Sequence, residues 1–196
     1  MAGSSHAARY SRIAIVLHWA IAILILVNLP LGIFNEEIEA VSGSSPMWLH
    51  KSIGLSVLVL SIARLAWRLA HRPPPLPETV GGWRRTASRV VHRLFYAFMI
   101  LVPLTGWIRT SAGSYPLTWF ALFDVPKFAI ERDTLEASAA ATVHEVLAWS
   151  LLALVVLHVA AALHHHYILR DRVLVRILPS NGARHVERRC GLDDGH

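Results

Sequence analysis

The stretch HEVLAWSLLALVVLH, which runs from His144 to His158, decides the fold class of this chain. It is almost entirely apolar, and a histidine stands at each end. In an α-helix, fourteen steps of about 100° bring the second imidazole back to within roughly 40° of the first, and a rise of about 1.5 Å per residue separates the two by roughly 21 Å. One apolar helix therefore presents two imidazoles on one face at two depths.

The composition predicts that this helix lies in a membrane. Of the 196 residues, 54% are hydrophobic and only 16% are charged, and the mean hydropathy is +0.45, which is too apolar for a soluble domain. No Asp, Glu, Lys or Arg occurs from Ile13 to Asn35, a segment long enough to cross about 30 Å of hydrocarbon. No small-residue cleavage site follows it, so we expect this segment to be retained and not removed as a signal peptide.

Three further apolar segments predict an all-α membrane protein, a four-transmembrane-helix bundle. The expected helices span residues of about 13–35, 48–70, 90–111 and 139–166. Pro30 and Gly32 mark a site of a kink near the far end of the first helix, and the third helix contains Pro103 and Gly106 and ends at Arg109. We expect one domain over residues 1–179, followed by a polar cytoplasmic tail at residues 180–196.

The charges predict the orientation of the bundle. Arginines precede the first helix and are frequent in the second connection and after the fourth helix, whereas the first connection carries Glu36, Glu37 and Glu39. By the positive-inside rule, both termini and the second connection are cytoplasmic. Membrane orientation thus explains the net charge of +6, and we expect no nucleic-acid partner. Cys190 is the sole cysteine, which excludes covalent C-x-x-C-H attachment of haem.

Two more histidines, His18 and His50, match the first two in depth. His18 and His158 both lie near the cytoplasmic side, and His50 and His144 both lie near the outer side. A lone buried histidine is often satisfied by a neighbouring hydroxyl or carbonyl, but two depth-matched pairs favour ligands. Zinc fits poorly, because pairs about 21 Å apart cannot share one ion and no Cys or carboxylate stands beside both pairs. Haem with two axial imidazoles fits each pair, so we expect two bis-histidine haems.

Three motifs resemble those of the bacterial cytochrome b561 family, over Tyr10 to about Pro179. They are YSRIAIVLHW at residues 10–19, LHKSIG at 49–54 with the following IARLAWR, and HEVLAWSLLALVVLHVAAALHHHY at 144–167. The resemblance implies a four-helix protein of the bacterial inner membrane with two non-covalent b haems. It places the axial iron ligands on two pairs of histidines, His18 with His158 and His50 with His144. It also implies oxidation of superoxide at the periplasmic side and reduction of ubiquinone at the cytoplasmic side.

Several other residues are candidates for contacts with the haems. Gly54 follows His50 by four residues, where a missing side chain lets a porphyrin approach the backbone, although simple helix packing explains it equally well. Arg64 repeats the fourteen-residue spacing from His50, so we expect it near the cytoplasmic haem as a propionate partner. Lys51 is expected to do the same for the outer haem, or to extend its amine to the membrane surface.

His92 and His164 are candidates for a quinone site, since histidine titrates near physiological pH and suits proton uptake. For His165 and His166 a polar interfacial belt is the preferred interpretation.

Two other functions remain open. Within the same fold, the chain would be a cytochrome b electron-carrier subunit for a hydrogenase or another respiratory oxidoreductase, with a redox protein as its partner. In a different class, it would be a haem-free proton or ion transporter. A transporter needs a polar pathway between the histidine pairs, yet the segment from Val146 to Leu157 offers only the hydroxyl of Ser150. A visible spectrum with haem quantification separates these classes.

Overall fold

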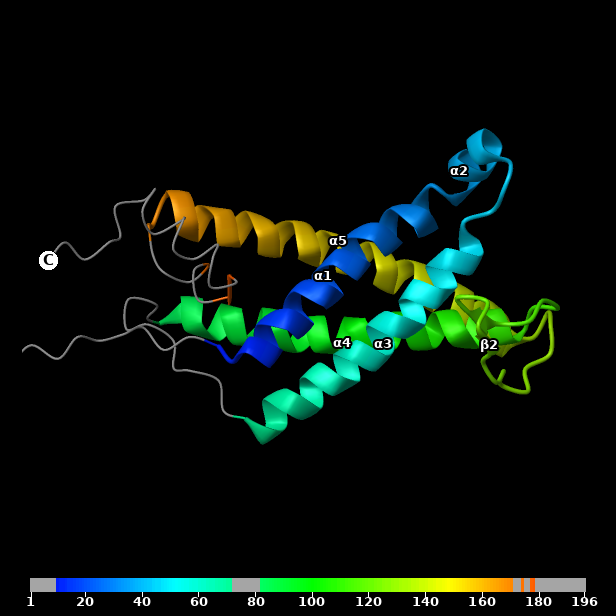
Figure 1. Ribbon diagram of the computed structural model, residues 1–196, viewed down its shortest axis with the longest axis horizontal. Coiled ribbons are helices and arrows are strands. Elements are labelled where there is room, and N and C mark those ends of the chain that lie inside the picture. Colours follow the sequence, from blue (N-terminus) through cyan, green and yellow to red (C-terminus); the bar gives the residue numbers. More distant parts are fainter. Residues whose placement is uncertain (1–9, 72–81, 171–173, 175–176, 179–196) are drawn as a thin grey trace, which may run out of the picture.

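A computed structural model describes residues 10–71, 82–170, 174 and 177–178 of the chain (Figure 1). Its four long helices are α1 (Arg12–Ile33), α3 (Met47–Ala70), α4 (Trp83–Ser111) and α5 (Leu135–Tyr167). All four are long and apolar enough to cross a membrane, which confirms the expected four-helix membrane fold. The proposed tail at residues 180–196 and Cys190 lie outside the described residues.

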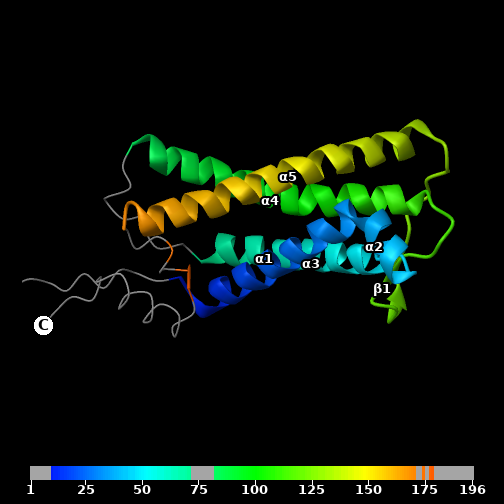
Figure 2. The same ribbon diagram turned by 90° about the horizontal axis from the view of Figure 1, so that it is seen from above.

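Successive long helices run in opposite directions (Figure 1). We call the end at which α1 and α4 begin the terminal end, and the opposite end the hairpin end. α1 packs on α3 and α4 packs on α5, so that the bundle has two layers (Figure 2) joined by contacts between α3 and α4. Backbone contact between α5 and either α1 or α3 is sparse at most. The histidine pairs expected from the sequence lie across these two sparsely packed interfaces.

The helices begin where local residues satisfy their first amide groups. The hydroxyls of Ser11 and Thr134 accept hydrogen bonds of 3.3 Å from the amides of Ala14 and Ala137, which caps α1 and α5. α4 begins seven residues earlier than the apolar pattern predicts. The residues of its first turns are basic and polar, and they can continue the helix outside the hydrocarbon. α5 likewise begins at Leu135, four residues upstream of the expected start.

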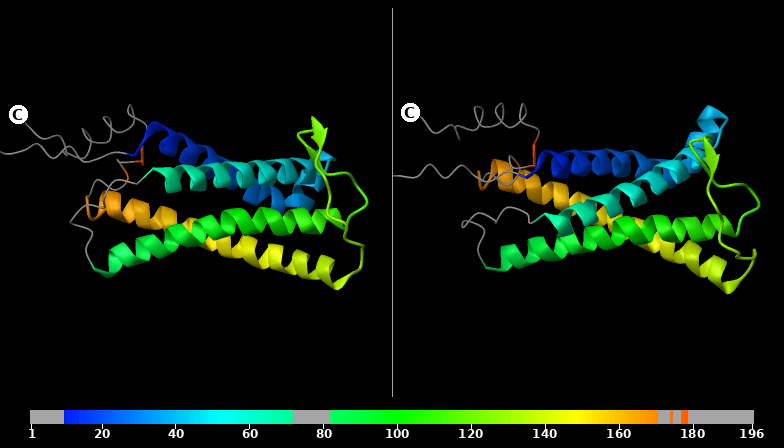
Figure 3. Two further views of the ribbon diagram at one scale, coloured as in Figure 1. Left: turned by 90° about the horizontal axis from the view of Figure 1, so that it is seen from below. Right: turned by 60° about the horizontal axis from the view of Figure 1, so that its bottom comes forward.

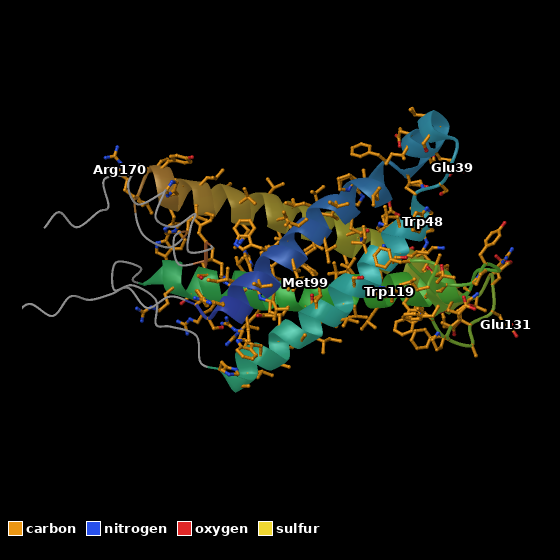
Figure 4. All side chains as sticks on the ribbon, in the orientation of Figure 1. Glu39, Trp48, Met99, Trp119, Glu131 and Arg170 are labelled. Atoms are coloured by element: carbon orange, nitrogen blue, oxygen red, sulfur yellow. The ribbon has the colours of Figure 1, made fainter. Side chains whose placement is uncertain are left out.

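The core of the bundle is small and lies at mid-height. Ile21, Ile53, Met99 and Leu151 come from the four long helices and form one buried cluster, and Met99 lies about midway along the bundle (Figure 4). Many other apolar side chains face outward, among them Val16, with an exposed fraction of 66%. This distribution suits a bundle whose outer surface is covered by lipid.

Two short elements at the hairpin end were not expected. α2 (Asn35–Ser42) follows α1, and β1 (Thr118–Trp119) pairs with β2 (Phe123–Asp124) in an antiparallel hairpin (Figure 3). Two hydrogen bonds join this hairpin to α3. The amide of Phe120 donates to the Ser52 hydroxyl at 3.0 Å, and the indole N–H of Trp119 donates to the Ser56 hydroxyl at 3.0 Å. Trp119 and Phe120 in the long connection are therefore held against α3.

Candidate functional site

The structure brings His50 of α3 and His144 of α5 together near the hairpin end. Their ring centroids are 6.3 Å apart and their planes are nearly perpendicular, at 89°. The rings do not stack on each other. Because nitrogen–metal bonds to imidazole are about 2 Å long, this separation leaves room for a metal bound to one nitrogen of each ring.

Both of these rings are oriented by backbone carbonyl groups. Nδ1 of His50 lies 3.1 Å from the carbonyl oxygen of Asn28 in α1, and Nδ1 of His144 lies 2.9 Å from that of Val102 in α4. A carbonyl oxygen can only accept, so each Nδ1 carries a proton and donates it. Each Nε2 then keeps a free lone pair. This is the tautomer in which a histidine ligates a metal while its other nitrogen is held by a carbonyl.

At the terminal end, His18 of α1 is held differently. Nη1 of Arg64 lies 3.0 Å from Nδ1 of His18. A guanidinium group can only donate, so Nδ1 of His18 accepts and the proton of the neutral ring lies on Nε2. His18 therefore has the opposite tautomer to His50 and His144.

His158 of α5 lies beside an unexpected imidazole. Its ring centroid is 6.0 Å from that of His92 in α4 and 5.0 Å from that of Phe95. Nδ1 of His92 donates to the Ser88 carbonyl at 2.6 Å, which leaves Nε2 of His92 with a free lone pair. His158, His92 and Arg64 all lie within electrostatic range of His18. His18 is thus accompanied by two further imidazoles and a guanidinium group.

Arg64 also shares an aromatic partner with a second arginine. The guanidinium carbons of Arg64 and Arg68 each lie 6.0 Å from the ring centroid of Tyr96 in α4, a distance at which a cation is attracted to an aromatic face. His164 does not join this group, because it is exposed in the last turn of α5 and its ring neighbour is His165.

The hairpin end carries a cationic group that the sequence reasoning identified only in part. Lys51 and Arg109 lie within electrostatic range of His50, and Lys127 lies within that range of Lys51. Arg109 also lies within electrostatic range of His144. Arg109 is the first charged residue after the long apolar run of α4, and this position is the sequence signal that could have identified it.

Gly54 does not face the paired imidazoles. A Cβ atom built on Gly54 would meet only the side-chain nitrogen of Asn28, at 3.6 Å. Its position favours close packing of α3 against α1 over approach of a porphyrin. The side-chain oxygen of Asn28 is buried and has no hydrogen-bond partner among the described residues.

Comparison with known proteins agrees with this architecture. The sequence profile of the prokaryotic cytochrome b561 family matches residues 9–180. Cytochrome b561 homolog 2 of Escherichia coli (strain K12) is 32% identical over 179 residues, which cover 89% of this chain and 94% of the relative. Cytochrome b562 of Cereibacter sphaeroides is 29% identical over 86% of this chain and 94% of its own length. A probable superoxide oxidase CybB of Yersinia pestis is 28% identical over 87% of this chain and 96% of its own length.

These matches confirm the resemblance seen in the sequence motifs, and they span the helices that carry all four depth-matched histidines. The chain therefore belongs to the prokaryotic cytochrome b561 family of b-haem membrane proteins that transfer electrons.

Proposed function

We propose that this protein holds two non-covalent b haems, one between His50 and His144 and one between His18 and His158, and conducts electrons across the bacterial inner membrane. Superoxide is the electron donor at the hairpin end, and ubiquinone is the acceptor at the terminal end. Haem supplies reversible one-electron chemistry when bound. The chain supplies the ligands, their spacing and access at each end.

The pairing of His50 with His144 carries the proposal. Both rings have a free Nε2 lone pair, their separation admits a metal between them, and each Nδ1 is fixed by a carbonyl from a neighbouring helix. Such carbonyl partners fix the orientation of metal-bound histidines and raise their basicity. The sparse backbone contact between α3 and α5 is consistent with a flat group between these helices.

The terminal end fits haem once Arg64 changes partner. Ligation through Nε2 of His18 requires the ring proton on Nδ1, where Arg64 now donates. A haem propionate is the partner that we propose for the released guanidinium, since arginine pairs well with carboxylates. Arg64 also lies within electrostatic range of His158, so one arginine is available to both proposed ligands.

The charges at the hairpin end favour a small anion as the electron donor. Lys51, Arg109 and Lys127 create positive potential beside His50, and such potential raises the local concentration of anions. The relative from Yersinia pestis is named a probable superoxide oxidase. Two superoxide anions would give two molecules of oxygen and two electrons. One ubiquinone would take up both electrons and two protons to form ubiquinol.

His92 suits proton delivery at the quinone end. Its ring is fixed by the Ser88 carbonyl, half-buried and directly beside His158, so it can pass a proton close to the proposed terminal-end haem. We place this end in the cytoplasm because arginines concentrate there. A cytoplasmic reporter fused after residue 180 should then be active, and a periplasmic reporter should not.

The test is a reduced-minus-oxidised visible spectrum with haem quantification on purified protein. We expect two b haems per chain, with His144→Ala losing mainly the hairpin-end haem and His158→Ala mainly the other. Full haem content in both variants would refute the ligand assignment. Absence of haem from the unaltered protein would instead favour the haem-free transporter.

A further inference from the structure

The His50 ring rests directly on a glycine of the neighbouring helix. A Cβ atom built on Gly32 of α1 would lie 2.7 Å from Cε1 and 3.0 Å from Nδ1 of His50. Real Cβ atoms are essentially never found so close to another heavy atom, so any side chain at this position has to displace the ring. The absence of a side chain at Gly32 is therefore what allows His50 its present orientation.

His144 has the same relation to a different helix. A Cβ atom on Gly106 of α4 would lie 2.9 Å from Cε1 and 3.1 Å from Nδ1 of His144. The two imidazoles are thus seated on two glycines that come from opposite layers of the bundle (Figure 2).

The carbonyl that binds each ring belongs to the same helical turn as its glycine. His50 donates to the carbonyl of Asn28, four residues before Gly32, and His144 donates to the carbonyl of Val102, four residues before Gly106. In an α-helix, the carbonyl of residue i points toward residue i+4, so the acceptor and the bare surface are adjacent.

We propose that Gly32 and Gly106 are positioning residues, each of which forms with the carbonyl four residues earlier a seat that sets the orientation of one hairpin-end imidazole. This inference rests on the proposed function, in which both rings ligate one haem. The seat therefore has two effects. The carbonyl fixes which nitrogen of the ring carries the proton, and the glycine fixes how closely the ring approaches the helix.

Close helix packing is the ordinary role of glycine in membrane helices, and Gly54 illustrates it. The nearest atom to a Cβ on Gly54 would be the Asn28 side-chain nitrogen, at an ordinary contact distance of 3.6 Å. For Gly32 and Gly106 the three nearest atoms are all imidazole atoms of a single histidine. A methyl group there would push the ring off its carbonyl, whereas a methyl group on Gly54 would be accommodated.

The experiment compares Gly32→Ala and Gly106→Ala with Gly54→Ala as the matched control. Haem content is measured per chain, and electron paramagnetic resonance of the oxidised protein reports the relative orientation of the axial imidazoles. The His144→Ala variant identifies which signal belongs to the hairpin end. We expect each of the first two variants to shift that signal and to weaken retention of that haem by about 10- to 100-fold, as loss of an outer partner does. The terminal-end haem should be retained, which also shows that the bundle is folded.

The outcomes separate this inference from the proposed function. Absence of haem from the unaltered protein would remove the proposed function itself. Two haems with unchanged signals in Gly32→Ala and Gly106→Ala would overturn only the positioning role. Loss of both haems in these variants, while His144→Ala keeps the terminal-end haem, would show that the glycines support the whole bundle and would equally overturn it.

Discussion

At the scale of single residues, the Nδ1 atoms of the histidines have different partners. Those of His50 and His144 donate to carbonyls, whereas that of His18 accepts from Arg64. A carbonyl partner makes an imidazole a more basic ligand and favours oxidised iron, whereas a nearby positive charge favours reduced iron. Cations lie beside both pairs, so the difference between the two ends rests on the carbonyl partners. With haem bound at both pairs, the terminal-end haem, whose His18 has no carbonyl partner among the described residues, should have the higher reduction potential, so that electron transfer from the hairpin end is favourable.

Replacing Arg64 with Met tests this asymmetry. Removal of the positive charge should lower the reduction potential of the terminal-end haem and leave that of the hairpin-end haem nearly unchanged. Arg68→Met is the matched control, because Arg68 contacts the same Tyr96 ring and makes no hydrogen bond to His18. An optical redox titration measures both haems. Equal shifts in the two variants would mean that the net charge at this end, and not the position of Arg64 in particular, sets the potential.

Replacing His92 with Ala tests whether His18 or His92 binds the same iron as His158. His92 is the ring neighbour of His158 and has a free Nε2 lone pair, so it competes with His18 for the role of ligand. Our assignment predicts that His92→Ala keeps two haems and loses quinone reduction, whereas His18→Ala loses the terminal-end haem. Haem quantification in the two variants checks this. The reverse pattern would transfer the ligand role to His92.

Sequence alone predicted the depths of these histidines but not their partners. The depth of a residue in the membrane follows from its position along its helix and the rise per residue, so the sequence of one segment, such as residues 144–158, is enough to predict it. The partners depend on how far each helix is rotated about its axis, and this is set by packing between helices. For Gly54 the sequence left haem contact and helix packing equally open, and the structure places Asn28 nearest to it, whereas Gly32 was interpreted only as a kink site and Gly106 was given no role.

At the scale of secondary-structure elements, length and apolar character were enough to predict the four membrane helices. They were not enough for the hairpin β1–β2, in which Phe120 and Ala121 have left-handed φ values of 47° and 57°. Neither residue favours that conformation. It is stabilised instead by tertiary hydrogen bonds to Ser52 and Ser56 of α3, which local sequence signals do not reveal.

The bond from Trp119 to Ser56 should contribute measurably to stability. Trp119 lies at the hairpin end of the bundle (Figure 4), and Ser56→Ala leaves its indole N–H without this partner. We expect a loss of about 1 kcal/mol, measured as a lower thermal midpoint in detergent. Ser150→Ala is the control, because its hydroxyl donates only to the Val146 carbonyl of its own helix. In the Trp119→Phe background, Ser56→Ala should cause little further loss if the pair acts through this bond, and the same loss of about 1 kcal/mol in both backgrounds would contradict it.

At the scale of the whole molecule, the two ends of the bundle carry different chemistry. The hairpin end has cations beside a preoriented histidine pair, and at the terminal end His18, His92 and His158 lie near arginines and Tyr96. The first arrangement suits rapid capture of an anion that gives up an electron without a proton. The second suits an acceptor that takes up protons, and this difference is consistent with the proposed direction of electron transfer.

The last prediction concerns this direction. Replacing Lys51 with Glu reverses one charge beside His50, so reduction of the haems by superoxide should slow at low ionic strength, and the difference should shrink as salt screens the charges. Arg89→Glu makes the same charge change on an exposed residue at the terminal end and should leave the rate unchanged. Rapid mixing of reconstituted protein with superoxide, followed in the visible spectrum, measures both variants. If superoxide leaves the haems oxidised in the unaltered protein while a redox protein reduces them quickly, superoxide is not the donor, and the chain is an electron-carrier subunit of a larger oxidoreductase.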